Sequence, residues 1–175
     1  GTIKAPMGAG ERVFMNGFQT WTCSKEYTAT DKIRGLHGLP KPLVNYFKFD
    51  RYGDYHFVDY PNKPGLFHGF SYCYFRDGDF YRLFASLDEE PGYTMFRYDA
   101  NKGELTIERD CAGIKCGGEY HVFDLFETSG QEDDVFDRWF TAMNVKPITD
   151  KRLKGYSSWY NRYENISQDS ILEDL

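Results

Sequence analysis

The chain has 175 residues and a mass of 20.5 kDa, enough for one domain or for one domain and part of a second. Its 21 Lys and Arg are scattered and outnumbered by 27 Asp and Glu, and the net charge of −6 disfavours a nucleic-acid partner. No stretch approaches the roughly 18 apolar residues that a membrane span requires, and residues 1–10 lack the pattern of a signal peptide. We therefore expect no membrane partner and a cytoplasmic location.

The first strands are predicted from an aromatic-rich composition. The chain holds 15 Phe, 14 Tyr, 3 Trp and 17 Gly, which is typical of β-structure. Residues 12–15 predict a short strand, and residues 55–60, between Gly53 and Pro61, predict another. Residues 67–75 predict a longer strand with a bulge at Gly69.

Turn residues then predict two hairpins. Asp77-Gly78 is a strong signal for a two-residue hairpin loop, and residues 80–87 supply the partner strand. A second hairpin follows, with strands at 93–98 and 104–109 around the turn at 101–103. Further along the chain, Gly117-Gly118 precedes one more strand at 119–128. Strands at spacings of about ten residues predict a mainly β fold, an antiparallel sandwich.

Two regions differ from the strand pattern. Residues 29–47 carry Gly and Pro with little periodicity and predict a long loop with a short helical turn, a kind of segment that is often functional. Residues 131–143 place apolar side chains at helical spacing, with acidic residues in the first turn, and predict an amphipathic helix. A polar connector with four basic residues follows at 146–154.

The last 21 residues predict a strand and a helix. Residues 155–161 favour a strand. Ser167 is a suitable N-cap for a helix with Ile171, Leu172 and Leu175 on one face. A strand, a loop and a helix in this order are the opening of a parallel βα unit, which cannot bury its own faces.

The sequence offers little support for metal, cofactor or nucleophile chemistry. Cys23, Cys73, Cys111 and Cys116 are too sparse for a disulfide scaffold and lack zinc-ligand spacing. None of the four histidines lies in a metal-binding motif, and no nucleotide-binding or serine-nucleophile motif occurs. We expect no cofactor and no metal. The acidic runs 88–90 and 132–134 are best explained as a solvated turn and a helix N-terminus.

Two aromatic clusters carry the strongest functional signal, at residues 16–21 and 155–163. Tryptophan and tyrosine beside Asn, Gln and Ser suit a carbohydrate subsite, because the flat rings can cover the apolar C–H face of a sugar while their polar edges donate hydrogen bonds. The alternative is that these rings belong to the core.

Both clusters resemble a known family, the family 36 glycoside hydrolases, or α-galactosidases (melibiases). The segment Asn16-Gly17-Phe18-Gln19-Thr20-Trp21 resembles the N-G/N-W-Q-S-W segment of their N-terminal domain, with Phe18 and Thr20 as departures. The segment Gly155-Tyr156-Ser157-Ser158-Trp159-Tyr160 is similar to the G-W/Y-x-S-W-Y that opens their catalytic barrel. The order of a β-rich domain, a connecting helix, a basic linker and a first barrel strand is also similar.

The resemblance implies a β-supersandwich at 1–130, a linking helix and connector at 131–154, and the first βα unit of a (β/α)8 barrel at 155–175. It implies binding of α-galactoside sugars, with Trp21, Trp159 and Tyr160 as substrate-contacting residues, and a homo-oligomeric complete enzyme. The two catalytic aspartates of the family lie on later barrel strands, so we expect no catalytic residue and no turnover in this chain alone. The alternatives are a non-catalytic carbohydrate-binding sandwich and an oligomerisation module.

Overall fold

The computed structural model describes residues 1–18, 22–90, 92–146, 149, 151–152, 154–160 and 162–174. The chain divides into two compact units, Gly1–Val145 and Lys146–Leu175. Of the residues named above as site candidates, Trp21 lies outside the described residues. None of the described helices is long and apolar enough to cross a membrane.

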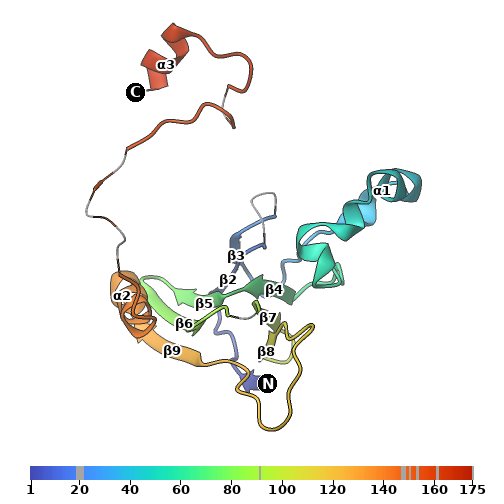
Figure 1. The fold of residues 1–175 in the computed structure, drawn as a ribbon, viewed down its shortest axis with the longest axis vertical. Coiled ribbons are helices and arrows are strands. Elements are labelled where there is room, and N and C mark those ends of the chain that lie inside the picture. The colour runs from blue at the N-terminus through green and yellow to red at the C-terminus, as the bar shows by residue number, and fades with distance from the viewer. Residues whose placement is uncertain are drawn as a thin grey trace. The chain divides into compact units, whose positions relative to one another are not determined.

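The first unit contains two antiparallel sheets (Figure 1). The four-stranded sheet has the order β1 (Thr2–Lys4), β8 (Glu104–Arg109), β7 (Thr94–Asp99), β4 (Leu66–Phe70). The five-stranded sheet has the order β3 (Lys25–Tyr27), β2 (Arg12–Met15), β5 (Tyr72–Asp77), β6 (Phe80–Ser86), β9 (Leu125–Gly130). The predicted mainly β, antiparallel fold is confirmed.

The two sheets share one aromatic core. Along β8 every second residue is buried, the alternation expected of a strand with one face in a core. Phe75 of the five-stranded sheet contacts Tyr98 of the four-stranded sheet edge to face, with ring centroids 4.8 Å apart. Both residues belong to one buried cluster: Ala5, Val13, Met15, Tyr27, Phe67, Cys73, Phe75, Phe84, Phe96, Tyr98, Leu105 and Ile107.

Ser71 divides the long strand that the sequence predicts at 67–75. It has a φ of 64°, so the chain turns there and β4 and β5 enter different sheets. The bulge predicted at Gly69 is wrong, because Gly69 pairs in register with Phe96. A Cβ at Gly69 would lie 3.0 Å from Asn16 Oδ1, so the glycine gives room to a neighbouring side chain instead.

Local signals located the hairpins and the first long helix. β5 and β6 pair through Asp77 and Phe80, which leaves Gly78 and Asp79 as the loop, and β7 pairs with β8 as predicted. The strand predicted at 119–128 begins later, at Leu125. Helix α2 (Glu132–Ala142) confirms the predicted helix and buries Val135 and Trp139 against the outer face of the five-stranded sheet.

The predicted loop region folds into short helices that we call the arm, residues 36–56. It comprises η1 (Leu36–Gly38), α1 (Lys41–Phe47), η2 (Phe49–Arg51) and η3 (Gly53–His56). The strand predicted at 55–60 is wrong. Asp54 turns inward and is 2% exposed, and the backbone N–H groups of Phe57 and Val58 donate to its carbonyl oxygen, which closes a helical turn.

The described residues of the second unit form one helix, α3 (Gln168–Asp174). Ser167 caps it as predicted, because the Ser170 N–H donates to Ser167 Oγ at 3.2 Å. Residues 154–160 do not form the predicted strand; the N–H of Arg162 instead donates to the Ser158 carbonyl in a turn. A strand needs a neighbouring strand to pair with, and the described part of this unit holds none. The barrel unit therefore stays a prediction.

Candidate functional site

The first aromatic motif begins with a tightly held backbone. Asn16 Oδ1 accepts a hydrogen bond from the Phe70 N–H at 2.6 Å, and the Gly17 N–H donates to Ser24 Oγ at 3.1 Å. The Phe18 N–H donates to Asp54 Oδ1 at 2.6 Å. Residues 16–18, which lead toward Trp21, are thus tied to three other segments of the chain.

Asp54 is the buried centre of this network. Its Oδ2 lies 3.0 Å from Nε2 of His68 and accepts a hydrogen bond from the Tyr60 hydroxyl at 3.2 Å. Asp54 is 2% exposed and His68 6% exposed. A buried carboxylate is costly unless several donors surround it, and three donors from three segments do so here. Burial, followed by the charge of Asp54, raises the pKa of Tyr60 far above its ordinary value.

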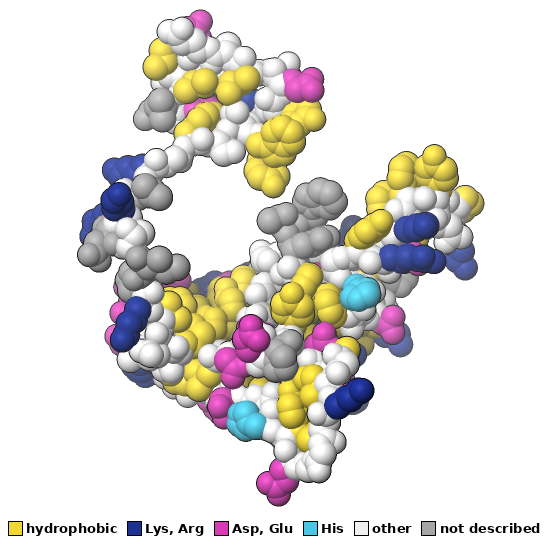
Figure 2. All heavy atoms as spheres, in the orientation of Figure 1, with side chains coloured by type: hydrophobic (Ala, Val, Ile, Leu, Met, Phe, Trp, Pro, Cys, Tyr) yellow, Lys and Arg dark blue, Asp and Glu magenta, His cyan; other side chains and the backbone are white. Residues whose placement is uncertain are grey.

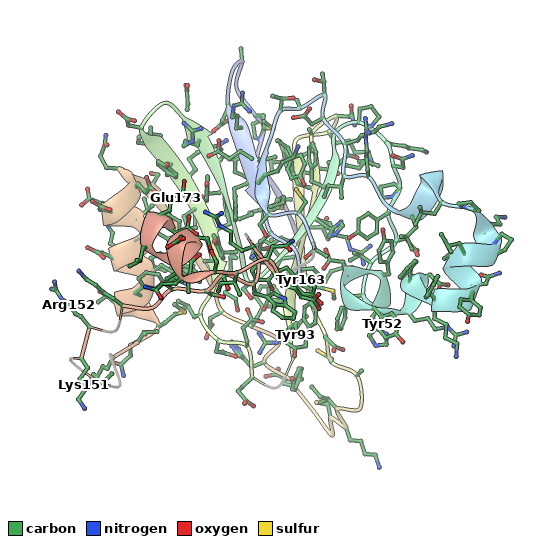
Figure 3. All side chains as sticks on the ribbon, turned by 90° about the horizontal axis from the view of Figure 1, so that it is seen from above. Tyr52, Tyr93, Lys151, Arg152, Tyr163 and Glu173 are labelled. Carbon is green, nitrogen blue, oxygen red and sulfur yellow. The ribbon has the colours of Figure 1, made fainter. Side chains whose placement is uncertain are left out.

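The Phe18 ring adds an apolar anchor to the same segment. It contacts Phe57 at a centroid distance of 4.6 Å, Tyr93 at 4.7 Å and Phe70 at 5.3 Å. Tyr93 is labelled in Figure 3. Tilted and edge-to-face contacts of this kind stabilise beyond the burial of area alone. Side chain and backbone of Phe18 are therefore both fixed.

An open, mostly apolar cavity of about 770 Å³ borders this network, within the range of small-molecule sites. Tyr60 belongs to both, because it lines the cavity and donates to Asp54. Its ring stacks on Tyr55 with centroids 4.3 Å apart. The cavity is lined by Thr22, Cys23, Ile33, Arg34, Leu36, Leu39, Phe47, Phe49, Tyr52, Tyr55 and Tyr60.

The cavity wall combines rings with hydrogen-bonding groups. Burial raises the pKa of Tyr55 as well as that of Tyr60, so both hydroxyls stay protonated at neutral pH, and the Tyr60 hydroxyl donates its hydrogen bond to Asp54. Arg34 adds a permanent charge at the rim. Tyr52, labelled in Figure 3, is 59% exposed and extends the aromatic surface along the arm. Flat apolar faces beside a few polar groups are suited to a ligand that has both kinds of surface.

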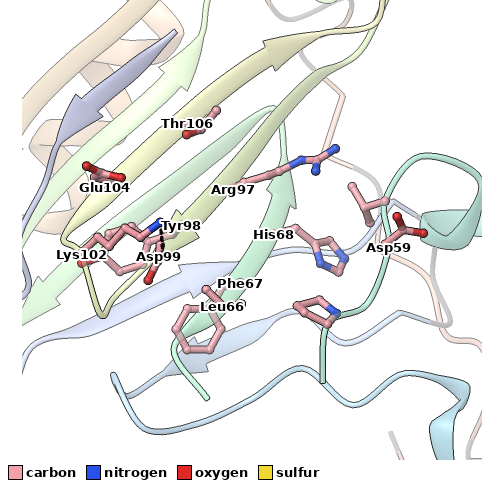
Figure 4. A pocket seen from close by; sticks show the side chains of 12 residues that line it. Asp59, Leu66, Phe67, His68, Arg97, Tyr98, Asp99, Lys102, Glu104 and Thr106 are labelled. Carbon is pink, nitrogen blue, oxygen red and sulfur yellow. Dashed lines mark ion pairs between the residues drawn. The ribbon is translucent and has the colours of Figure 1, made fainter. Parts of the chain in front are cut away.

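A second pocket, of about 390 Å³, lies on the outer face of the four-stranded sheet (Figure 4). Four of the charged side chains that line it, Arg97, Asp99, Lys102 and Glu104, already have ion-pair partners. Asp99 pairs with Lys102 at 3.4 Å, and Arg97 pairs with Glu108 at 2.8 Å. This pocket offers no exposed aromatic plate, since its two aromatic residues, Phe67 and Tyr98, are buried. The cavity beside Asp54 is the stronger candidate.

The predicted site residues fall in different parts of the chain. Trp159 is 60% exposed and Tyr160 80% exposed, both in the second unit. Trp159 meets Tyr163 edge to face at a centroid distance of 4.7 Å. The side chains of Trp159 and Tyr160 therefore lie on the surface and not in a core. Trp21 lies outside the described residues. Their convergence on one sugar stays a prediction.

Sequence reasoning missed Asp54, His68 and the aromatic wall of the cavity. Seven Phe or Tyr occur among residues 46–60, far above the 18% average of the chain, and this density was a usable signal. No local pattern marked Asp54, because its partners lie 36 residues before it and 6 and 14 residues after it, at no regular spacing.

Comparison with known proteins adds no relative. No family model, curated protein or solved structure matches this chain. Within the part of the chain that the structure describes, no group of three or more His, Cys, Asp or Glu is arranged to hold a metal ion.

Proposed function

We propose that this chain is the N-terminal part of an α-galactosidase-like retaining glycoside hydrolase and supplies aromatic walls to its galactose subsite. The observation that carries the proposal is the anchored segment 16–18 beside an aromatic cavity. This segment opens the motif that resembles the family, and an anchored backbone next to rings is what a wall of a sugar site requires.

The side chains of the cavity have the chemistry that a galactoside needs. Tyr55 and Tyr60 present ring faces, and Tyr55 also has a protonated hydroxyl. The Tyr60 hydroxyl, which donates to Asp54, can still accept a hydrogen bond, and Arg34 adds a donor. A pyranose has one apolar C–H face and a rim of hydroxyls. Aromatic faces cover the former, and the polar groups bind the latter.

Trp159 and Tyr160 support the proposal from the second unit. Two large aromatic side chains that stay 60% and 80% exposed leave apolar surface in water. Exposed apolar surface of this kind marks places that meet a ligand or another part of a protein. Their sequence context resembles the opening of the family's catalytic barrel.

Bond cleavage is not part of the role we assign to these residues. Glycoside hydrolysis with retention uses two carboxylates about 5 Å apart, one as nucleophile and one as acid and base. The resemblance puts both on later barrel strands. We therefore expect the isolated chain to be inactive and its binding of galactose to be weak.

Kinetics of the complete enzyme that the proposal implies test it. We expect Trp21→Ala to lower kcat/KM for 4-nitrophenyl α-D-galactopyranoside by about tenfold or more, since a sugar-stacking ring is lost. Phe140→Ala is the matched control, because Phe140 is also a large apolar ring, 44% exposed, on the outer surface of α2. Unchanged kinetics in Trp21→Ala would remove this ring from the site, and absence of α-galactosidase activity in the complete protein would refute the proposal.

Titration of the isolated chain with melibiose separates this proposal from a non-catalytic binding sandwich. Tight binding by the chain alone would favour the binding sandwich, since that reading needs a complete site within these residues. The charged outer face of the four-stranded sheet argues against it (Figure 4).

One observation favours the other alternative, an oligomerisation module. Helix α1 buries none of its residues, and Leu43, Tyr46 and Phe47 are 40%, 80% and 49% exposed. Figure 2 shows hydrophobic side chains gathered on this arm beside basic ones. Sedimentation over a range of concentrations tests whether the chain self-associates, which is compatible with the proposed enzyme being a homo-oligomer.

A further inference from the structure

We propose that Asp54 is the positioning residue of this site: its buried carboxylate orients the Tyr60 ring at the cavity wall and holds the backbone at Phe18, from which the chain continues to Trp21. The role in sugar binding rests on the proposed function, whereas the role in holding the segment does not.

The three donors to Asp54 come from separate parts of the first unit. Phe18 follows β2, Tyr60 follows the arm, and His68 lies within β4. A single carboxylate therefore fixes the distance between the motif segment, the cavity wall and the sheet. An apolar residue at position 54 could fill the space, but it would leave a buried N–H, a hydroxyl and a ring nitrogen without a partner.

The segment that Asp54 holds is short. The Gly17 N–H donates to Ser24 Oγ, so residues 17 and 24 are also tied together. Only Gln19 and Thr20 stand between Phe18 and Trp21 in the sequence, so Asp54 holds the backbone two residues before the start of Trp21. Tyr60 is restrained at both ends, by its hydroxyl on Asp54 and by its ring on Tyr55.

The chemistry of position 54 separates positioning from simple packing. Asparagine has the same shape, and its oxygen can still accept from the Phe18 N–H. Its NH₂ can donate to the oxygen of the Tyr60 hydroxyl. It can also donate to Nε2 of His68 when the imidazole carries its proton on Nδ1. Alanine provides none of these bonds. Asp54→Asn should therefore retain most of the arrangement that Asp54→Ala loses.

Solution NMR on the chain itself tests the inference without sugar. The chain has three tryptophans, so 5-fluorotryptophan labelling gives three ¹⁹F signals, and Trp21→Phe identifies that of Trp21. In Asp54→Ala we expect the Trp21 signal to shift and broaden and the Phe18 amide to lose its protection from exchange. Trp139, packed against the other sheet, should keep its signal. Asp54→Asn should resemble the wild type, and Asp79→Ala, at an exposed hairpin aspartate, is the control.

Each result decides the inference. An unchanged Trp21 signal and a protected Phe18 amide in folded Asp54→Ala would overturn it. If Asp54→Ala does not fold, two other variants test the inference. Asp54→Asn should preserve the Trp21 signal, and Asn16→Ala should broaden it. A broadened signal in Asp54→Asn together with an unchanged signal in Asn16→Ala would overturn the inference. In the complete enzyme, Asp54→Ala should raise KM more than it lowers kcat, whereas Asp54→Asn should stay close to the wild type. NMR effects without any change in kcat/KM would uphold the positioning role and contradict the proposed function.

Discussion

Phe96 and Trp159 are both large aromatic side chains, yet Phe96 is 0% exposed between two sheets and Trp159 is 60% exposed in the second unit. The contrast extends to the regions around them. The first unit buries a cluster of twelve residues between its sheets. Among the described residues of 146–174, none is buried.

This difference in burial shows that aromatic content does not by itself make a core. A ring is buried only where a second layer covers the first, and the first unit supplies two sheets and helix α2. The described part of the second unit has one short helix and no strand to cover it. Its rings are therefore available to another surface, as the proposed sugar site requires.

Truncating one ring in each unit tests this contrast and has the largest expected effect. Phe96→Ala should lower the free energy of unfolding by about 3–5 kcal/mol, because it leaves a cavity in a fully packed core. Trp159→Ala should change it by less than about 0.5 kcal/mol, as for other exposed positions. Urea denaturation followed by far-ultraviolet circular dichroism measures both. A large loss of stability in Trp159→Ala would mean that the second unit contributes to the core after all.

The sequence predicted what local chemistry determines. Gly78 marks its hairpin because the two-residue loop itself needs a positive φ, and the period of Val135, Phe136 and Trp139 marks α2 because one helix face must be apolar. These signals need no distant partner. The same holds for Ser167, which caps the helix that follows it.

Features that depend on distant residues were not predicted. Residues 55–60 have the composition of a strand, but the three donors around Asp54 hold the adjacent chain in a helical turn. The turn at Ser71 is fixed by hydrogen bonds to Thr94 and Ser86 in the two sheets. The aromatic cavity was missed for the same reason, since its wall joins residues from 22 to 60.

Each unit contains an ion pair, and the pH dependence of stability tests how much each pair contributes. Glu26 accepts from Arg76 Nε at 2.6 Å, and this hydrogen bond is the main cause that lowers the pKa of Glu26 below its ordinary value of 4.5. The unfolded chain therefore binds a proton more readily, so the contribution is present above about pH 4.5 and is lost as the pH falls through the lowered pKa.

Glu26→Gln should cost about 1.5–3 kcal/mol at neutral pH, the value of a hydrogen bond to a charged group, and the cost should shrink as the pH falls below about 4.5. Glu173→Gln is the control, since its pair with Arg162 leaves the Glu173 side chain 75% exposed. Denaturation curves at several pH values measure both variants. A cost for Glu26→Gln that does not depend on pH would show that the ion pair is not its source.

The smallest effect should be confined to the second unit. Ser167→Ala removes the cap of α3 and should destabilise that helix by about 1 kcal/mol, which speeds exchange of the Ser170 amide by about fivefold. Ser157→Ala, at an exposed serine of the same unit, is the control. Neither variant should alter the unfolding of the sandwich, because α3 buries no residue. If amides across 155–174 were instead strongly protected in a dilute monomer, this unit would have a core of its own, and its exposed rings would no longer argue for a surface that is completed by the rest of a barrel.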